Sequence, residues 1–286
     1  MAPAVNGCIL LVSMKTYIFS AALAASSAFF LSPRANAGPD FVDLGASSSF
    51  AVVAGSGITV AGAVASTHII GNIGTFPTTS ITGLEKVVLV GTNHAGDGLT
   101  QGAKTDLLDA YNDAASRAFN QSFAGGFDLG GLTLTSGVYN GTSSLFLTGT
   151  LTLDAKGNPD AVFIFQTGST FITASNSLVQ LIGGAQACHV FFQVGSSATL
   201  GTGTDFAGNI LALESITVNT SADITGRLLA LNGAVTLDTN TIDLAVCNEV
   251  VGGPGGSPVP DHSATLPLIG AGLAALATVG RKFTQG

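Results

Sequence analysis

The sequence predicts a mainly β protein, a β-solenoid of triangular coils with one long α-helix packed along an apolar face. Three observations predict this fold: many glycines with few charges, segments that recur every 18 or 19 residues, and one amphipathic helical stretch. Of the 286 residues, 38 are glycine, 46% are hydrophobic and 9% are charged, against roughly 25% charged residues in an ordinary soluble domain.

The composition also excludes several classes of function. A formal net charge of −8 and scattered basic residues argue against nucleic acid as a partner, because nucleic-acid binders need basic patches. The hydrophobic content argues against disorder, and the scarcity of Glu, Lys and Arg argues against a coiled coil or charged helical bundle. Few titratable groups remain for acid–base catalysis, so we expect no enzyme.

The N-terminus is predicted to be a leader, residues 1–37. Lys15 supplies a positive charge, Tyr17–Leu31 is apolar, and Ala35-Asn36-Ala37 is a typical cleavage site for a secretory signal peptide. The uncharged residues before it indicate Met14 as the true start. The alternative, a transmembrane anchor, requires a longer apolar run.

The C-terminus is predicted to be a Gly/Pro linker over residues 249–260 and a hydrophobic tail over 261–286. Val259-Pro260-Asp261, the apolar run Leu266–Gly280 and Arg281-Lys282 resemble the PEP-type sorting signals of Gram-negative bacteria. The resemblance implies transient membrane contact, processing, and release to the cell surface or extracellular matrix. A plain C-terminal anchor helix remains the alternative.

Between these ends, residues 38–248 form the predicted solenoid domain, and its repeats define the coils. Each repeat pairs an apolar strand with a Thr-containing strand: 162–166 with 170–173, 190–194 with 197–202, 209–212 with 215–220, and 227–230 with 234–239. Thr199, Thr217 and Thr236 are 18 and 19 residues apart. At about 3.3 Å per residue, this period fits one triangular coil, with Gly, Asn and Ser at the corners.

Strand parity divides the second strand of each coil into two faces. The inward residues are apolar: Ala198, Leu200, Ile216, Val218, Val235 and Leu237. The outward residues are small or hydroxylated: Ser197, Thr199, Gly201, Ser215, Thr217, Asn219, Ala234 and Thr236, with Asp154 and Asp238 at the edge. We further expect a corner column of Thr202, Thr220 and Thr239, and contributions from Thr150, Thr152 and Thr173 in earlier coils.

The first strand of each coil is apolar on both faces and therefore needs a cover. The stretch 100–120 can supply it, because its apolar residues follow i, i+3, i+4, i+7 spacing. These residues are Ala103, Leu107, Ala110, Tyr111, Ala114 and Ala118. A helix lying along the solenoid axis is predicted.

Three long stretches, Ala187–Thr202, Phe206–Ala212 and Asn232–Thr241, resemble the microbial ice-binding proteins. Tyr111–Ala115 is similar to the helix of that family and Leu129–Tyr139 to the return into its solenoid. The resemblance covers 42–247. It implies a right-handed, discontinuous β-solenoid, in which the chain leaves for the helix and then returns.

The resemblance also implies function. It implies a secreted or cell-surface monomer, without cofactor or metal, that adsorbs to ice through one flat face and inhibits ice growth and recrystallisation. Its partner is the ordered water of the ice surface. Family members use irregular sets of small and hydroxylated residues to contact ice. The resemblance therefore implies which face contacts ice, but not an exact set of residues. A rigid face of Thr methyls and hydroxyls loses little entropy on adsorbing.

Two other classes are compatible with a Thr-rich solenoid. An adhesive or structural matrix protein would suit the sorting tail equally well. A polysaccharide-acting enzyme would need clustered acids or a metal site, whereas His68, His94 and His189 follow no ligand spacing and are expected at surfaces or turns. Asp205, Asp223 and Asp243 recur at near-repeat spacing, where we expect corner capping rather than Ca²⁺ binding.

Cys188 and Cys247 would both be exported, which permits a disulfide. In a monotonic stack they lie about three coils apart, roughly 14 Å, whereas a bridge needs Cα atoms within about 7 Å. A bridge therefore requires the chain after Thr241 to run back along the stack. The sequence leaves both arrangements open.

Overall fold

The computed structural model describes residues 38–247. The leader, linker and tail predicted for 1–37, 249–260 and 261–286, and the start at Met14, lie outside the described residues. Within 38–247, no helix is long and apolar enough to cross a membrane.

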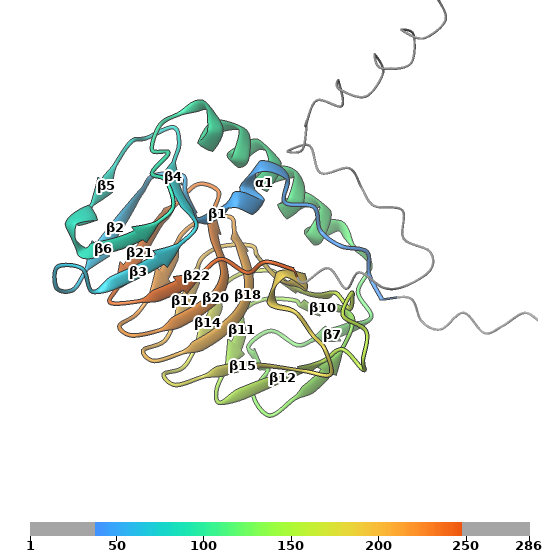
Figure 1. The fold of residues 1–286 in the computed structure, drawn as a ribbon. Coiled ribbons are helices and arrows are strands. Elements are labelled where there is room, and N and C mark those ends of the chain that lie inside the picture. The colour runs from blue at the N-terminus through green and yellow to red at the C-terminus, as the bar shows by residue number, and fades with distance from the viewer. Residues whose placement is uncertain (1–37, 248–286) are drawn as a thin grey trace, which may run out of the picture. The chain divides into compact units, whose positions relative to one another are not determined.

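The described chain is a parallel β-solenoid with three strand faces (Figure 1). One face, called here the flat face, is an eight-stranded sheet. Its strands in spatial order are β5 (Ile81–Thr82), β2 (Gly57–Ala61), β21 (Ala234–Asp238), β19 (Ile216–Val218), β17 (Ala198–Leu200), β14 (Phe171–Thr173), β11 (Leu145–Leu147) and β8 (Phe127–Asp128).

The other two faces share the long strands β18 (Asp205–Ala212) and β20 (Asp223–Ala230). The helix-covered face adds β4 (Asn72–Thr75), β1 (Phe50–Ala54), β16 (Val190–Val194), β13 (Phe163–Thr167), β10 (Gly137–Gly141) and β7 (Gln121–Phe123). The third face, called here the acidic face, adds β6 (Val87–Val90), β3 (Thr67–Ile70), β22 (Thr241–Asp243), β15 (Leu178–Ile182), β12 (Thr150–Asp154) and β9 (Thr133–Thr135).

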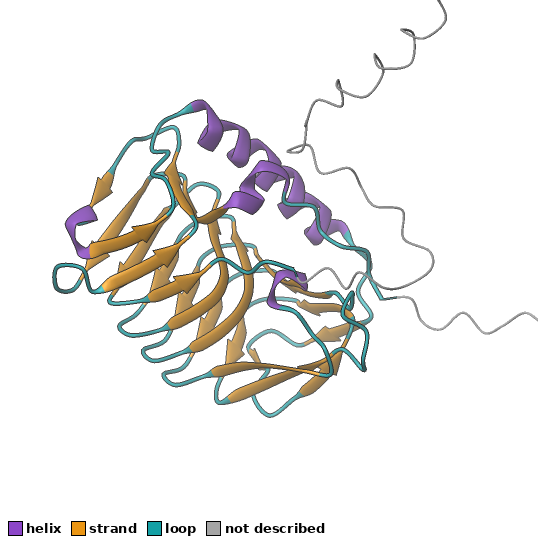
Figure 2. Ribbon diagram, in the orientation of Figure 1, coloured by secondary structure: helices purple, strands orange, loops and turns teal. Residues whose placement is uncertain are grey.

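The stack is discontinuous in sequence, as predicted. Strands β1, β2 and β3 pair with β20, β21 and β22, so the N-terminal coils stack on the C-terminal ones. After β6 the chain enters helix α1 (Gly98–Ser116), which runs along the stack to the far end, where β7 begins (Figure 1). Figure 2 shows this single long helix beside the strands.

Helix α1 covers the strands that are apolar on both faces. Five of the six predicted apolar positions are buried: Ala103, Leu107, Ala110, Tyr111 and Ala114. They pack against residues such as Val53, Ile164, Phe191 and Leu229. The predicted range 100–120 was too long at its end, because Arg117 has extended backbone and Ala118 is exposed. The side chain of Asp97 accepts a hydrogen bond from the Thr100 N–H and caps the start.

The corner between the flat and acidic faces has a left-handed residue in every coil. These residues are Gly62 and Ala65 in the first coil, and then Gly83, Gly131, Gly149, Asn176, Gly203, Ser221 and Thr239. Thr239 was predicted to align with Thr202 and Thr220, and this was wrong. Those two threonines precede a left-handed residue, whereas Thr239 is itself the left-handed residue of its coil, with φ 55°.

The interior is filled by the inward side chains of all three faces. The six inward residues predicted from parity, including Leu200, Val218 and Leu237, are 0–1% exposed. Aromatic rings stack from coil to coil: Phe165 and Phe192 lie 4.5 Å apart between ring centroids, and Phe171 lies 4.7 Å from Phe192. Stacked coils of this kind make a rigid scaffold for the outward residues.

Cys188 and Cys247 form a disulfide, with Cα atoms 5.5 Å apart. The separation of about three coils expected for a monotonic stack does not apply, because the chain after β22 leaves the strand. It runs back across β20 and β18 to the short 3₁₀ helix η3 (Ala187–His189), as Figure 1 shows. Two further 3₁₀ helices are η1 (Gly45–Ser49) and η2 (Leu84–Lys86).

Candidate functional site

Five threonines form one outward column along the flat face. Thr199 pairs in register with Thr217, Thr217 with Thr236, Thr236 with Thr59, and Thr59 with Thr82. With about 4.8 Å between neighbouring strands, this threonine column is about 19 Å long. Because each side chain leaves a paired strand, the column is held by the backbone ladder rather than by loops.

The sequence predicted the three members from the C-terminal coils, Thr199, Thr217 and Thr236, and missed Thr59 and Thr82. A signal for Thr59 was present, since Ile58-Thr59-Val60 has the same apolar–Thr–apolar pattern as Ile216-Thr217-Val218. Its place in the stack could not be read, because it depends on the N-terminal coils joining the C-terminal end.

A column of small residues flanks the threonines on the side toward the helix-covered face. Ala234 pairs with Gly57, and Ser197 and Ser215 precede the threonine-bearing strands of their coils. The Ser197 hydroxyl accepts the Ser215 N–H, and the Ser215 hydroxyl accepts the Ala234 N–H, both at 3.2 Å. These bonds fix the serine side chains, so that the surface beside the threonines does not protrude.

On the other side, the flat face ends in Gly201, Asn219 and Asp238. Gly201 is buried, and Asn219 is partly buried. The Asp238 carboxylate accepts the Thr220 hydroxyl at 2.5 Å and the Thr239 hydroxyl at 3.2 Å. This carboxylate is therefore tied to the corner, while Thr202 is exposed there.

Three predicted members of the face do not contribute to its outer surface. Thr150 and Thr152 belong to β12 on the acidic face, because in that coil the strand of the flat face is β11, earlier in the chain. Thr173 is on the flat sheet but points inward, is 3% exposed, and bonds the Thr204 hydroxyl at 2.9 Å.

The threonine column therefore ends at Thr199. Ile172 pairs with Thr199, Phe146 with Ile172, and Asp128 with Phe146. The coils nearest β8 thus continue the same outward line with apolar residues and finally a carboxylate. The hydroxylated surface is confined to the end of the stack that the N-terminal coils complete.

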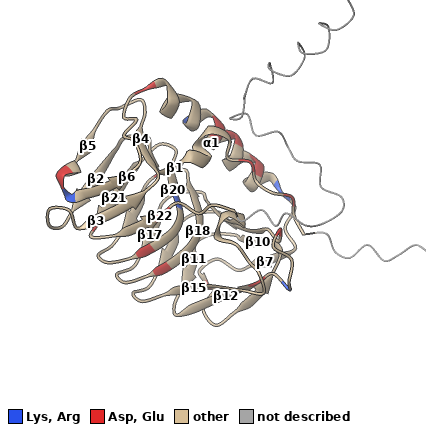
Figure 3. Cartoon of the chain, in the orientation of Figure 1, with Lys and Arg blue, Asp and Glu red and all other residues tan. Residues whose placement is uncertain are grey.

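The third face differs from the flat face in charge. Asp205 and Asp223 are exposed and adjacent in register, and Asp154 and Asp243 lie on strands of the same face. Asp243 pairs with Thr225 instead of Asp223, so the three near-repeat aspartates do not form one column. Figure 3 shows acidic residues on strands of this face and along helix α1.

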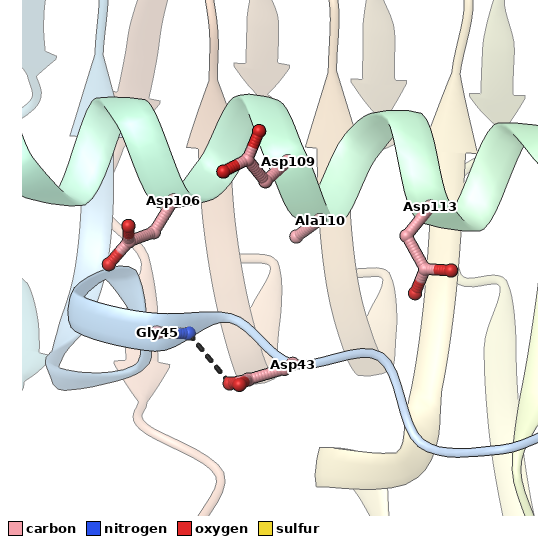
Figure 4. A pocket seen from close by; sticks show the side chains of 6 residues that line it. All are labelled: Asp43, Gly45, Asp106, Asp109, Ala110 and Asp113. Carbon is pink, nitrogen blue, oxygen red and sulfur yellow. Dashed lines mark hydrogen bonds between the residues drawn. The ribbon is translucent and has the colours of Figure 1, made fainter.

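A cleft of about 350 Å³ lies between helix α1 and the N-terminal segment, lined by Asp43, Gly45, Asp106, Asp109, Ala110 and Asp113 (Figure 4). Three of its four carboxylates bond nearby groups of the chain. Asp43 accepts the Gly45 N–H, Asp106 accepts the Ala46 N–H, and Asp113 pairs with Arg117. These contacts attach the N-terminal segment and the helix end, which is a structural role.

The three histidines lie in different settings. His68 is exposed on β3, as expected, and His94 bonds Asp97 at the start of the helix. His189 lies in the 3₁₀ turn η3, within the expectation of a surface or turn, but it is only 9% exposed and therefore not at the surface. It lies beside the disulfide, and in the described chain Cys188, His189 and Cys247 are the one group of three or more potential metal ligands whose ligand atoms lie within 4.8 Å of one another.

Comparison with known proteins gives a consistent result. A family model described as ice-binding-like matches residues 52–243. An ice-binding protein of Nostoc sp. (strain HG1) is 43% identical over 85% of this chain and 88% of its own length. The ice-binding protein of Flavobacterium frigoris (strain PS1) is 35% identical over 72% of this chain and 77% of its own.

Solved structures agree with the fold. An ice binding protein from an Antarctic biological consortium matches with a TM-score of 0.69 and 45% identity, over 73% of this chain and 93% of its own. The ice-binding protein of the ascomycete Antarctomyces psychrotrophicus matches with a TM-score of 0.69 and 40% identity, over 73% of this chain and all of its own.

Proposed function

The chain belongs to the family of ice-binding-like proteins, and we propose that it adsorbs to ice through the threonine column of its flat face. Adsorption there inhibits ice growth and recrystallisation. The observation that carries the assignment to this face is the in-register run of Thr199, Thr217, Thr236, Thr59 and Thr82.

The chemistry of the column suits a solid water surface. Methyl groups at a fixed spacing order the adjacent water, and the hydroxyls hydrogen-bond to it. The strand ladder fixes the side chains beforehand, so little conformational entropy is lost on adsorption. Ser197, Ser215, Ala234 and Asn219 complete the contact area as small neighbours.

The acidic face is unsuited to the same task. Ionised carboxylates such as Asp205 and Asp223 hold water in geometries imposed by the charge, and removing that water is costly. On the flat face the carboxylate of Asp238 is engaged by two hydroxyls at the corner. Charge therefore supports the flat face over the acidic one.

The proposal includes an extracellular location. A signal peptide over 1–37 and a sorting tail over 261–286 would deliver the domain to the cell surface or matrix, with transient membrane contact through the tail. The domain would act as a monomer, since the column is complete within one chain.

The test is nanolitre osmometry of the purified protein with a single ice crystal under slow cooling. We expect a gap between melting and freezing points and a faceted crystal. The variant Thr217→Tyr should lose most of this difference between melting and freezing points, because the tyrosine ring prevents the ice surface from contacting the threonine column. The matched control, Thr225→Tyr, places the same ring at an exposed threonine of the acidic face and should keep the gap.

A round crystal without a gap, from protein shown to be folded by circular dichroism, would overturn the proposal. It would favour the adhesive or matrix function instead. Equal losses in the two tyrosine variants would show that the flat face had been wrongly chosen.

A further inference from the structure

His189 is held in one orientation beside the Cys188–Cys247 disulfide. Its Nδ1 lies 2.9 Å from the carbonyl oxygen of Pro159, and its ring meets the edge of Phe41 at 5.4 Å between centroids. A carbonyl oxygen only accepts hydrogen bonds, so Nδ1 carries the proton in this contact. In the neutral ring, Nε2 is then an acceptor with a free lone pair.

That lone pair is directed at sulfur. Nε2 lies 3.4 Å from Sγ of Cys247, and a disulfide sulfur has no hydrogen to donate. With the side chain only 9% exposed, the imidazole acceptor is left facing a group that cannot satisfy it, which is unfavourable in a buried site. A thiol or a metal ion at the sulfur position would satisfy it.

From this arrangement we propose that the reduced form of the protein binds a thiophilic divalent cation, of the Zn²⁺ type, through Sγ of Cys188, Sγ of Cys247 and Nε2 of His189. Two thiolates and an imidazole are ligands that Zn²⁺ prefers. The bond from Nδ1 to the Pro159 carbonyl is the outer contact that orients metal-binding histidines.

The distances fit such an ion. Ligands at about 2.3 Å for sulfur and about 2.0 Å for nitrogen on a tetrahedral ion lie about 3.5 Å apart, close to the 3.4 Å between Nε2 and Sγ. The two sulfurs would move to about 3.8 Å apart. With the Cα atoms 5.5 Å apart, rotation of the cysteine side chains supplies that change. Cys247 is only partly buried, which leaves the fourth position to water.

Reduction of the disulfide must precede binding of the cation. A dithiol or phosphine reductant transfers two electrons, and two protons are taken up, so the disulfide becomes two thiols. Binding of the cation releases those two protons and forms two metal–sulfur bonds. The segment after β22 is thus fastened to η3 in both states, by a disulfide in oxidising surroundings and by a cation in reducing ones.

The test uses Co²⁺ as a spectroscopic probe on full-length protein in a Cys8→Ser background, which removes the third cysteine. After anaerobic reduction and removal of the phosphine, we expect one equivalent of Co²⁺ to give thiolate charge-transfer and tetrahedral d–d absorption, which Zn²⁺ then abolishes. The oxidised protein should give neither band.

Histidine variants distinguish a site made of both thiolates and the imidazole from a site made of the two thiolates alone. His189→Gln should weaken Co²⁺ binding about 10-fold or more, whereas the matched control His68→Gln, at an exposed histidine, should not. X-ray absorption of the reduced, Zn²⁺-loaded parent protein needs no histidine variant and should show two sulfur and two nitrogen or oxygen ligands.

Three results would overturn the proposal. These are no tetrahedral bands from reduced, folded protein, equal affinity in His189→Gln, or equal binding by the oxidised form. None of them bears on ice adsorption, because the cluster lies away from the flat face and is tested without ice.

Discussion

Thr59 lies directly beside Thr236 in the parallel ladder of the flat face, although the two residues come from opposite ends of the domain. The pairing joins the N-terminal coils to the C-terminal coils and extends the threonine column by two members. Half of its length therefore depends on a junction between distant parts of the chain.

We expect Thr59→Tyr to weaken ice adsorption as much as Thr217→Tyr does. The tyrosine ring would lie in the same column and sterically prevent ice from contacting the adjacent threonines. Thermal hysteresis at equal protein concentration measures the effect, with Thr225→Tyr as the control on the acidic face. A hysteresis gap unchanged in folded Thr59→Tyr would restrict the contact area to the C-terminal coils.

Gln166 connects the solenoid to the end of helix α1. Its amide nitrogen donates to the carbonyl oxygens of Ala114, Ala115 and Arg117, and the side chain is 4% exposed. Gln166→Leu leaves these carbonyls without that donor and should lower the free energy of unfolding by about 1–3 kcal/mol.

Urea denaturation checks this, and Gln180→Leu is the control, since Gln180 is exposed on the acidic face. The control should change stability by no more than about 0.5 kcal/mol. Similar stabilities for the two leucine variants would contradict the role of Gln166 in holding the helix.

Phe192 stands in the middle of the aromatic stack, with Phe165 at 4.5 Å and Phe171 at 4.7 Å between ring centroids, and is fully buried. Phe192→Ala should lower the free energy of unfolding by about 3–5 kcal/mol through lost burial and a cavity. Phe119→Ala, at a side chain 54% exposed, should be nearly neutral in the same urea titration. A small effect at Phe192 would show that the coils repack around the gap.

Lys104 makes stability depend on pH in the alkaline range. Burial lowers the pKa of its ammonium group to about 8, while its Nζ donates to the Ala230 carbonyl at 3.3 Å. The folded state then loses its proton near pH 8, and the unfolded state keeps it until about pH 10.4. Between these values the unfolded state binds more protons, so stability rises with pH.

We therefore expect the free energy of unfolding to increase from pH 8 to pH 9.5 in the parent protein more steeply than in Lys104→Met. Lys86→Met, which removes a lysine outside the helix, should keep the parent slope. Parallel slopes for the parent and Lys104→Met would show that the ammonium group is solvated in the folded protein.

The repeating coil of this protein and the buried side of its helix are both predictable from local sequence patterns. The 18- and 19-residue spacing of Thr199, Thr217 and Thr236 gave the coil, parity gave their outward direction, and the spacing of Leu107, Ala110 and Ala114 gave the helix and its buried side. These are local periodicities, set by the two-residue repeat of a strand and the 3.6-residue repeat of a helix.

The folded stack alone establishes which coils are neighbours. It brought Thr59 and Thr82 into the column, turned Thr173 inward, moved Thr150 and Thr152 to another face, and brought Cys247 back to Cys188 and His189. The physical reason is that insertions shift strand register between coils, and hydrogen bonding between strands is satisfied equally well by any parallel neighbour. Which neighbour is chosen depends on packing across the whole stack, which no local pattern records.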